Sequence, residues 1–240
     1  MREPEVPREA QQPVTFAGGN VVVPHGTVAH GQWRLALVSD LSPAWESLTN
    51  EEWRTVARFA GEARRRDWCA GRYAAKQAAI QLLGASAGHR LRIIRDAGGA
   101  PRARLRVGRG REVAVPIRLS VAHRDGRGVA AASTLKLHVG VDLERDNGIA
   151  PERARYFLTP DERARTSRTL EELWAVKEAV WKALACHDAS PFTEMELRFD
   201  DAQRVRAVAI GGREEAVDVV LGRPWPGYVL AVCLLPERQT

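Results

Sequence analysis

The sequence has no apolar run long enough to cross a membrane, which takes about 20 residues. The longest run near its C-terminus, Val229–Leu235, has the length of a buried strand. The first residues, MREPEVPREAQQP, mix acids, arginines and prolines and contain no hydrophobic segment, so we expect no secretory signal among them. We therefore expect a cytoplasmic protein with no membrane partner and with a disordered tail over residues 1–20.

Cysteine is scarce and unsuitably spaced for a disulfide framework. The three cysteines are far apart and form no C-x-x-C pair: Cys69, Cys186 and Cys233. An odd number at these spacings argues against disulfides and against a structural zinc site, and it fits a reducing compartment.

Lysine is rare among the 36 basic residues, most of which are arginine. It occurs only at Lys76, Lys136, Lys177 and Lys182. The net charge of +6 and the isoelectric point near 9.7 indicate an acidic or phosphorylated partner. Nucleic acid, a phosphate-rich cofactor and an acidic protein all fit the charge alone.

The first part of this chain of 240 residues predicts a strand, two helices and several short strands. Residues 33–38 alternate in polarity, as in a half-buried strand. Thr49 and Glu52 have the spacing of a capping box, which predicts a helix start. A longer helix is expected from about Arg64 to Leu83, with Gly84 as its terminator. Short β-like runs follow at 91–95, 103–107, 117–123 and 129–133.

The longer helix is expected to have an apolar face and a separate basic stripe. The apolar residues that lie close to one face are Cys69, Tyr73, Ile80 and Leu83. The basic residues, spaced i, i+7 and i+11, are Arg65, Arg72 and Lys76. Such a stripe fits a solvated face or a nucleic-acid footprint equally well on charge alone.

The second part of the chain repeats this content. A strand is expected over 137–144, and Thr159 with Glu162 predicts a capped helix. Thr169 and Glu172 repeat the capping signal for a helix that runs to about Leu184. Strands are expected at 195–199, 205–210, 216–221 and 228–235.

Helices followed by strands thus occur twice, which favours an α+β fold over the strict alternation of a parallel α/β sheet. The boundary belongs near residues 134–136, so we expect two α+β halves, 21–136 and 137–240.

Three short segments could carry chemistry. In Gly140-Val141-Asp142-Leu143-Glu144, strand alternation puts Asp142 and Glu144 on one face. Two adjacent carboxylates repel one another unless a cation lies between them, and Mg²⁺ held by carboxylates and substrate phosphates suits the pair. The simpler interpretation is an exposed strand end with Arg145 as the counter-charge.

The second segment is Trp174-Ala175-Val176-Lys177-Glu178-Ala179-Val180-Trp181-Lys182-Ala183, on the helix expected after Thr169. Glu178 and Lys182 are i, i+4 neighbours, which is ordinary for a surface ion pair. The alternative is that Glu178 is a third metal or base carboxylate and that Lys182 binds phosphate.

The third segment, Leu119-Ser120-Val121-Ala122-His123-Arg124-Asp125-Gly126, is a strand running into a turn. His123 could be a hydrogen-bonded turn residue. Against a phosphate, His123 and Arg124 could both donate hydrogen bonds.

The order of these segments resembles the phosphopantetheinyl transferases of the surfactin-synthetase-activating type. The chain has, in sequence, GRYAAK on a basic helix, a G-A-P turn at residues 99–101, SVAH, VGVDLE and WAVKEAVWKA. The last two match the family's most specific motifs, and the resemblance covers about residues 33–235.

This resemblance implies two α+β halves related by a pseudo-twofold axis, with coenzyme A between them. It implies Asp142, Glu144 and Glu178 as Mg²⁺ ligands and Glu178 and Lys182 as catalytic residues. Lys177 is the other lysine of the helix motif. The residues implied for coenzyme A are Arg65, Arg72, Lys76, Ala100, Pro101, Ser120, His123, Asp142 and Lys182.

The implied reaction transfers 4′-phosphopantetheine from coenzyme A to a serine of an acyl or peptidyl carrier protein of fatty acid, polyketide or nonribosomal peptide synthesis. A monomer is expected, since related single-half synthases trimerise. Ala122 replaces a common serine, and Ala100 replaces a common basic residue that Arg102 could substitute. Two alternatives stay open: a coenzyme A-binding protein of this fold without catalysis, and a basic nucleic-acid-binding module.

Overall fold

The computed structural model describes residues 22–28, 31–84, 90–108, 110–165, 167–184, 192–200, 202 and 204–236. The tail expected over residues 1–20 and Cys186 lie outside these ranges. None of the helices in the described ranges combines the length and the apolar character that a membrane crossing requires.

The N-terminal half is built on an antiparallel sheet of order β1-β2-β7-β6. Its strands are β1 Val22–Val28, β2 Gly31–Val38, β6 Ile117–Arg124 and β7 Arg127–Thr134. The 22-residue helix α3, Glu62–Leu83, covers one face. A second sheet of order β3-β4-β5 lies beside it, formed by Leu91–Arg95, Pro101–Val107 and Arg111–Ala114. Two short helices, α1 Ser42–Glu46 and α2 Asn50–Val56, pack on α3.

The C-terminal half repeats the helix-on-sheet arrangement. Its central sheet has the order β12-β13-β8, from Asp218–Gly222, Tyr228–Pro236 and Leu137–Arg145. The helix α5, Leu170–Leu184, packs on β8 and β13. The remaining elements are η2 Pro151–Tyr156, α4 Pro160–Arg165, η3 Phe192–Glu194, β9 Met195–Phe199, β10 Val205–Ile210 and β11 Arg213–Ala216.

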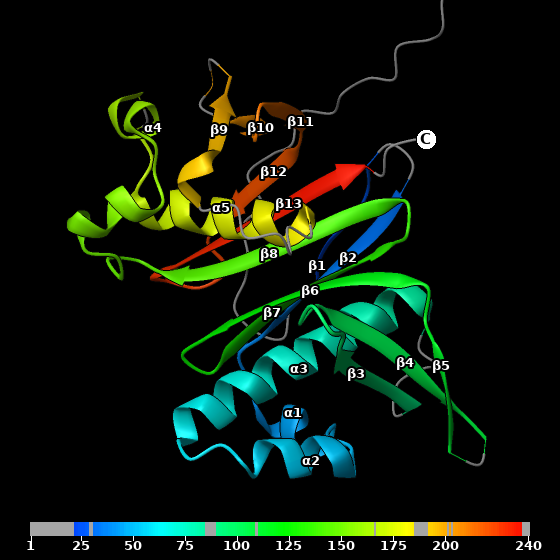
Figure 1. Ribbon diagram of the computed structural model, residues 1–240. Helices are drawn as coiled ribbons and strands as arrows, with labels where there is room; N and C mark the ends of the chain where they lie inside the picture. The colour runs from blue at the N-terminus through cyan, green and yellow to red at the C-terminus, as the bar shows by residue number, and fades with distance from the viewer. Residues whose placement is uncertain are drawn as a thin grey trace, which may run out of the picture.

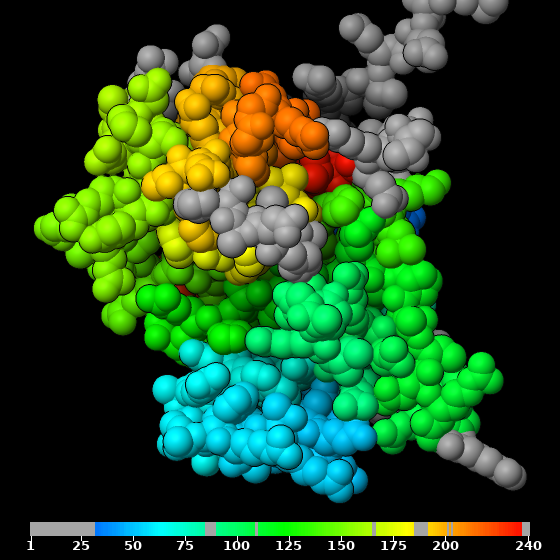
Figure 2. Space-filling model, in the orientation of Figure 1, coloured from blue at the N-terminus to red at the C-terminus, as the bar shows by residue number. Residues whose placement is uncertain are grey.

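The two central sheets face one another, with α3 and α5 on their outer sides (Figure 1). The core between the sheets takes residues from both halves, such as Leu35 and Val129 from one and Val141 and Leu230 from the other. In the space-filling view, cyan α2 and α3 form the lower end and the yellow and orange C-terminal elements the upper end (Figure 2). The mixed α+β fold expected from the sequence is confirmed.

Glycines in both halves let a helix lie directly on its sheet. A Cβ at Gly128 of β7 would lie 2.2 Å from the carbonyl oxygen of Ala70 in α3. A Cβ at Gly140 of β8 would lie 1.8 Å from the carbonyl oxygen of Ala179 in α5. Backbone cannot yield to such contacts, so both positions need glycine for packing.

The buried face of α3 consists mainly of alanines, Ala70, Ala74, Ala75, Ala78 and Ala79, whereas Leu83 is 39% exposed. Small side chains occupy this face because the helix lies so close to Gly128 of β7. The strand expected over residues 216–221 is interrupted at Val217, where β11 ends and β12 begins.

Candidate active site between the two halves

A cavity of about 280 Å³ opens between the halves. Residues of α3, β3, β6 and the turn before β4 form most of its wall, and Trp181 and Lys182 of α5 complete it. Two elements that are far apart in the chain therefore meet at one concave site. Such a cavity with converging cations is the arrangement expected of a binding site for an anionic ligand.

Arg72 is the one member of the predicted basic stripe that lines this cavity. Its guanidinium lies 4.5 Å from the ring centroid of Trp68 and donates a hydrogen bond to the carbonyl oxygen of Ile93. Burial lowers the pKa of Arg72 to about 10, although the Glu52 carboxylate opposes this shift. Arg72 therefore stays protonated at neutral pH and faces the cavity from a fixed position.

The other two members of the stripe are engaged elsewhere. Lys76 is only 3% exposed, and its Nζ lies 2.5 Å from Glu52 Oε2 and 2.6 Å from the carbonyl oxygen of Ser47. Arg65 donates to the carbonyl oxygen of Phe59 at 2.7 Å. Of the three basic residues implied for coenzyme A, Lys76 is covered by Glu52 of α2, and neither Lys76 nor Arg65 lines the cavity.

Arg95 is a cavity residue that the sequence analysis missed. It ends β3, is exposed and lines the cavity together with Trp68 and Arg72. No hydrogen bond or ion pair ties its guanidinium to another group among the described residues. The available signal was strand alternation, which puts Arg95 on the same face as buried Leu91 and Ile93, next to the predicted glycine turn.

The turn that leads into β4 supplies Ala100 to the cavity, and Pro101, the first residue of β4, also lines it. Asp96 holds this turn, since its Oδ1 accepts from the backbone N–H of Ala100 at 2.9 Å. Arg102 bonds to Asp96 at 2.8 Å and does not line the cavity. Arg102 therefore does not replace the basic residue that is missing at position 100.

His123 reaches the cavity from the end of β6. A Cβ at Gly71 would lie 2.9 Å from its ring, so this glycine makes room for the imidazole against α3. His123 keeps an exposed surface, but desolvation by the protein packed around its ring lowers the pKa of His123, as do the Lys182 and Arg95 cations, while Asp67 opposes them. The ring is therefore mainly neutral at pH 7.

Ser120, also implied as a cofactor residue, lines the cavity but has a structural bond as well. Its side chain is 3% exposed, and its Oγ accepts from the backbone N–H of Val141 at 3.0 Å. This bond joins β6 of one half to β8 of the other and fixes the residue that precedes Asp142.

The paired carboxylates of β8 are buried, contrary to the expectation of an exposed strand end. Asp142 and Glu144 are 7% and 8% exposed. Glu144 pairs with Arg124 at 3.2 Å, and burial together with the Asp142 charge raises the pKa of Glu144. Asp142 Oδ1 accepts from Lys182 at 2.7 Å, whereas Asp142 Oδ2 is buried without a hydrogen-bond partner.

Lys182 connects these carboxylates to the cavity. Its Nζ bonds to Asp142 and, at 3.1 Å, to the carbonyl oxygen of Val141, and it lies 3.7 Å from Glu178 Oε2. Burial lowers the pKa of Lys182, but the Asp142 and Glu178 charges outweigh it and the pKa is raised. Burial and the Asp142 charge raise the pKa of Glu178 against the effect of Lys182. The pair is thus part of a buried charge network and not an isolated surface pair.

The predicted metal ligands gather in one region but do not form a ready-made cage. In the described ranges, no three His, Cys, Asp or Glu side chains are placed to hold a metal ion. Lys182 occupies one oxygen of Asp142, while the orphaned Oδ2 is an anionic oxygen that a cation would satisfy. The donor set is all carboxylate, which suits Mg²⁺.

Lys177, the other lysine of the helix motif, points away from this network. It is fully buried, and its Nζ bonds to Glu162 Oε2 at 2.7 Å. It also donates to the carbonyl oxygens of Phe157, Met195 and Phe192 at 2.6, 2.6 and 3.1 Å. Lys177 therefore joins the residue after η2 and the elements α4, η3 and β9 to α5, and it has no access to a ligand in the cavity.

Comparison with known proteins bears on the C-terminal half. No curated protein matches the chain. Among 22 matching chains of solved structures, Thermotoga maritima holo-acyl-carrier-protein synthase is 19% identical, with a TM-score of 0.36. That match covers 42% of this chain and 64% of the other, so this chain spans less than two thirds of that relative. A Chronobacterium ammoniagenes synthase in complex with CoA is 24% identical over 43% of this chain and 98% of its own, with a TM-score of 0.32.

A family model gives the more specific result. Residues 138–233 match the model of the 4′-phosphopantetheinyl transferase superfamily. The matched range contains Asp142, Glu144, Glu178 and Lys182, the residues that meet beside the cavity. The C-terminal half of this chain thus carries the sequence pattern of the 4′-phosphopantetheinyl transferase superfamily.

Proposed function

We propose that this protein transfers 4′-phosphopantetheine from coenzyme A to a serine of an acyl or peptidyl carrier protein. One observation carries the proposal. Lys182 lies in the wall of the cavity and also bonds to Asp142, within the region that matches the transferase superfamily. A phosphate bound in the cavity would therefore lie close to the carboxylates and to a protonated lysine.

The cations of the N-terminal half are suited to bind the phosphates of coenzyme A. Arg72, Arg95 and His123 line the cavity with Lys182, and each can donate hydrogen bonds to phosphate oxygens. An anion beside His123 would raise its pKa and recruit it as a charged donor. We assign the phosphate contacts to these residues in place of Lys76 and Arg65.

We also propose that Asp142, Glu144 and Glu178 hold Mg²⁺, on the strength of the unpartnered Asp142 Oδ2. Magnesium supplies, when bound, neutralisation of negative charge on the phosphate oxygens. For Asp142 and Glu144 to bind Mg²⁺, Lys182 would turn from Asp142 towards the phosphate, and the ion pair between Arg124 and Glu144 would weaken.

In the proposed step, the carrier serine Oγ forms a bond to the β-phosphorus of coenzyme A. The bond from that phosphorus to the bridging oxygen breaks, and 3′,5′-ADP leaves with the electron pair. Glu178, which lies beside Lys182 at 3.7 Å, takes the serine proton as the general base. Lys182 stabilises the negative charge on the transferring and leaving phosphates.

Two helix-on-sheet halves in a single chain support the surfactin-synthetase-activating type of transferase, which works as a monomer. Carrier proteins of polyketide or nonribosomal peptide synthesis would then be the partners. The net charge of +6 would steer encounter with their acidic surfaces.

Mass spectrometry of an apo carrier protein after incubation with coenzyme A and Mg²⁺ tests this function. A mass gain of one phosphopantetheine is expected with the wild type. Glu178→Gln and Lys182→Met should each lower kcat by about 10², the scale of losing one charge-stabilising or proton-transferring group. Glu172→Gln makes the same chemical change on the same helix outside the site, and it should keep the wild-type kcat.

Two outcomes would replace the proposal. If the wild type binds coenzyme A but modifies no carrier, the protein is a binding protein of this fold without catalysis. If it binds DNA of any sequence and no coenzyme A, the nucleic-acid alternative holds. The burial of Lys76 and the backbone bond of Arg65 weaken that alternative, because they remove two cations from the expected footprint.

A second assay tests the phosphate assignment. Arg95→Ala should raise the KM for coenzyme A more than it lowers kcat, because a remote phosphate is bound alike in the ground and transition states. Arg106→Ala, an exposed arginine on β4 outside the cavity, is the matched control. If Arg95→Ala leaves the preference for coenzyme A over dephospho-coenzyme A unchanged, Arg95 does not bind the 3′-phosphate.

A further inference from the structure

The turn between β6 and β7 follows directly after two residues of the candidate site. His123 lines the cavity, and Arg124 pairs with Glu144 of β8 at 3.2 Å. Asp125 and Gly126 form the turn, with φ of 49° and 74°. Two successive positive φ values are those of a type I′ hairpin, and they are costly for a residue other than glycine.

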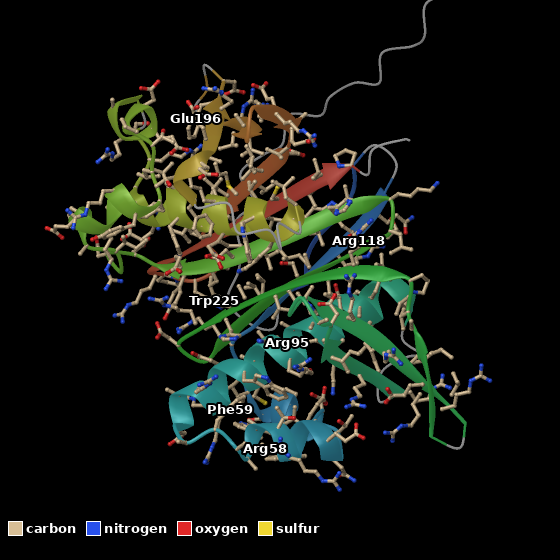
Figure 3. All side chains as sticks on the ribbon, in the orientation of Figure 1. Arg58, Phe59, Arg95, Arg118, Glu196 and Trp225 are labelled. Carbon is tan, nitrogen blue, oxygen red and sulfur yellow. The ribbon has the colours of Figure 1, made fainter. Side chains whose placement is uncertain are left out.

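The C-terminal half holds this turn through one tyrosine. The hydroxyl of Tyr228, the first residue of β13, donates to Asp125 Oδ2 at 2.8 Å. It also accepts from Arg127 Nη1 at 2.9 Å. The Arg127 guanidinium lies over the rings of Tyr228 and Trp225, at 4.4 and 5.7 Å from their centroids. Figure 3 shows Trp225 at this junction of the two halves.

The N-terminal half holds the same turn from the other side. The backbone N–H of Gly126 donates to Asp67 Oδ1 of α3 at 2.5 Å. A Cβ at Gly126 would lie 3.5 Å from the Arg66 guanidinium, so α3 packs closely against the turn. The turn is therefore fixed between α3 and β13.

Tyr228 is in turn tied to the strand that carries the carboxylates. It pairs with Arg145 in the register of β13 and β8, and the next pair joins Val229 to Glu144. The backbone N–H of Asp146 also donates to the carbonyl oxygen of Gly227 at 2.9 Å. A displacement of Tyr228 would thus change the distance between the carboxylate strand and the His123 hairpin.

We propose that Tyr228 is a positioning residue, which sets the location of His123 and Arg124 through its hydrogen bond to Asp125. This inference rests on the proposed function, because it assigns His123 to the phosphates of coenzyme A. Tyr228 does not line the cavity. Its hydroxyl instead holds the N-terminal half of the site in register with the C-terminal half.

The test is a double-mutant cycle on the Kd for coenzyme A, measured by calorimetry. Tyr228→Phe keeps the ring and removes the hydroxyl, and it should weaken binding by about tenfold, a modest cost for misplacing a site group. In a His123→Ala background, the same change should weaken binding by less than about twofold, because the group that it positions is gone. Equal effects in both backgrounds would overturn the proposal.

Three further variants separate positioning from general stability. Asp125→Asn keeps an acceptor oxygen and a residue that tolerates positive φ, so it should bind coenzyme A nearly as the wild type does. Asp125→Ala should behave like Tyr228→Phe. Trp225→Phe removes part of the packing beside Tyr228 without removing its hydroxyl, so it should lower Tm and leave the Kd unchanged. A fall in affinity that follows Tm across all four variants would contradict the proposal.

The same experiment distinguishes this inference from the proposed function. A wild type that binds coenzyme A without modifying carriers removes the transfer reaction, but the cycle on the Kd still decides the role of Tyr228. A wild type that does not bind coenzyme A overturns both.

Discussion

Changing each of the two lysines of the α5 motif to methionine should have different effects. Lys177→Met should destabilise the fold, whereas Lys182→Met should mainly remove activity. Lys177 is fully buried with four oxygen acceptors, while the Lys182 side chain is 24% exposed beside the cavity. The same substitution in one helix therefore tests which lysine is structural.

The expected loss follows from what Lys177→Met leaves behind. Glu162 would keep its bonds from the backbone N–H groups of Thr159 and Leu197, at 2.7 and 2.8 Å, but it would lose its only lysine partner. Breaking a buried ion pair from one side costs about 3–5 kcal/mol, against a usual total stability of about 5–15 kcal/mol. At about 2–4 °C per kcal/mol for a chain of this size, Tm should fall by about 6–20 °C.

Urea unfolding monitored by tryptophan fluorescence measures this loss. Adding Glu162→Gln to Lys177→Met should recover part of it, because the unpaired charge disappears while an acceptor for the helix cap remains. A Lys177→Met protein within about 1 kcal/mol of the wild type would refute the reasoning. A water molecule that replaced the ammonium group and bonded to Glu162 would also keep the loss of stability small. The double variant is therefore measured as well, because it removes the Glu162 charge that such a water would have to satisfy.

Three further predictions concern the site and its support. Asp142→Ala should abolish transfer, and chelation of divalent ions should do the same to the wild type; full activity in chelator would exclude a metal. His123→Asn should make stability less sensitive to acid, because a lowered pKa means that the unfolded state binds the proton first as pH falls below about 6.5. Urea titrations at pH 7.5 and 5.5 should therefore show a larger loss for the wild type than for the variant, and equal losses would contradict the shift. Gly140→Ala should prevent stable folding, since its Cβ would overlap the Ala179 carbonyl, whereas Gly61→Ala meets no atom within 4 Å and should fold.

Local signals in the sequence predicted most element boundaries. The capping box at Thr49 and Glu52 is present with both hydrogen bonds, and the bonds at Thr159 and Thr169 follow the same pattern. Gly84 ends α3 with a φ of 93°. These features depend on residues three or four apart in the chain, so their spacing alone is sufficient.

Long-range packing decided what the spacing could not. The positions of Arg65, Arg72 and Lys76 on α3 agree with their i, i+7, i+11 pattern, yet only Arg72 reaches the cavity. Helical spacing states which residues share a face, but not which other element covers that face. Here Glu52, on a separate short helix, accepts a bond from Lys76 and buries it. The missing information was the docking of α2 on α3.

The same limit applies to the carboxylates. Strand alternation correctly put Asp142 and Glu144 on one side of β8, but it predicted a solvent-facing pair. Burial raises the cost of their charges, and the fold meets it with Lys182 from α5 and Arg124 from β6, one cation from each half. A carboxylate pair balanced in this way can exchange one cation for another without leaving an uncompensated charge. The proposed metal–phosphate complex is compatible with this charge balance if Lys182 moves with the phosphate as it leaves Asp142.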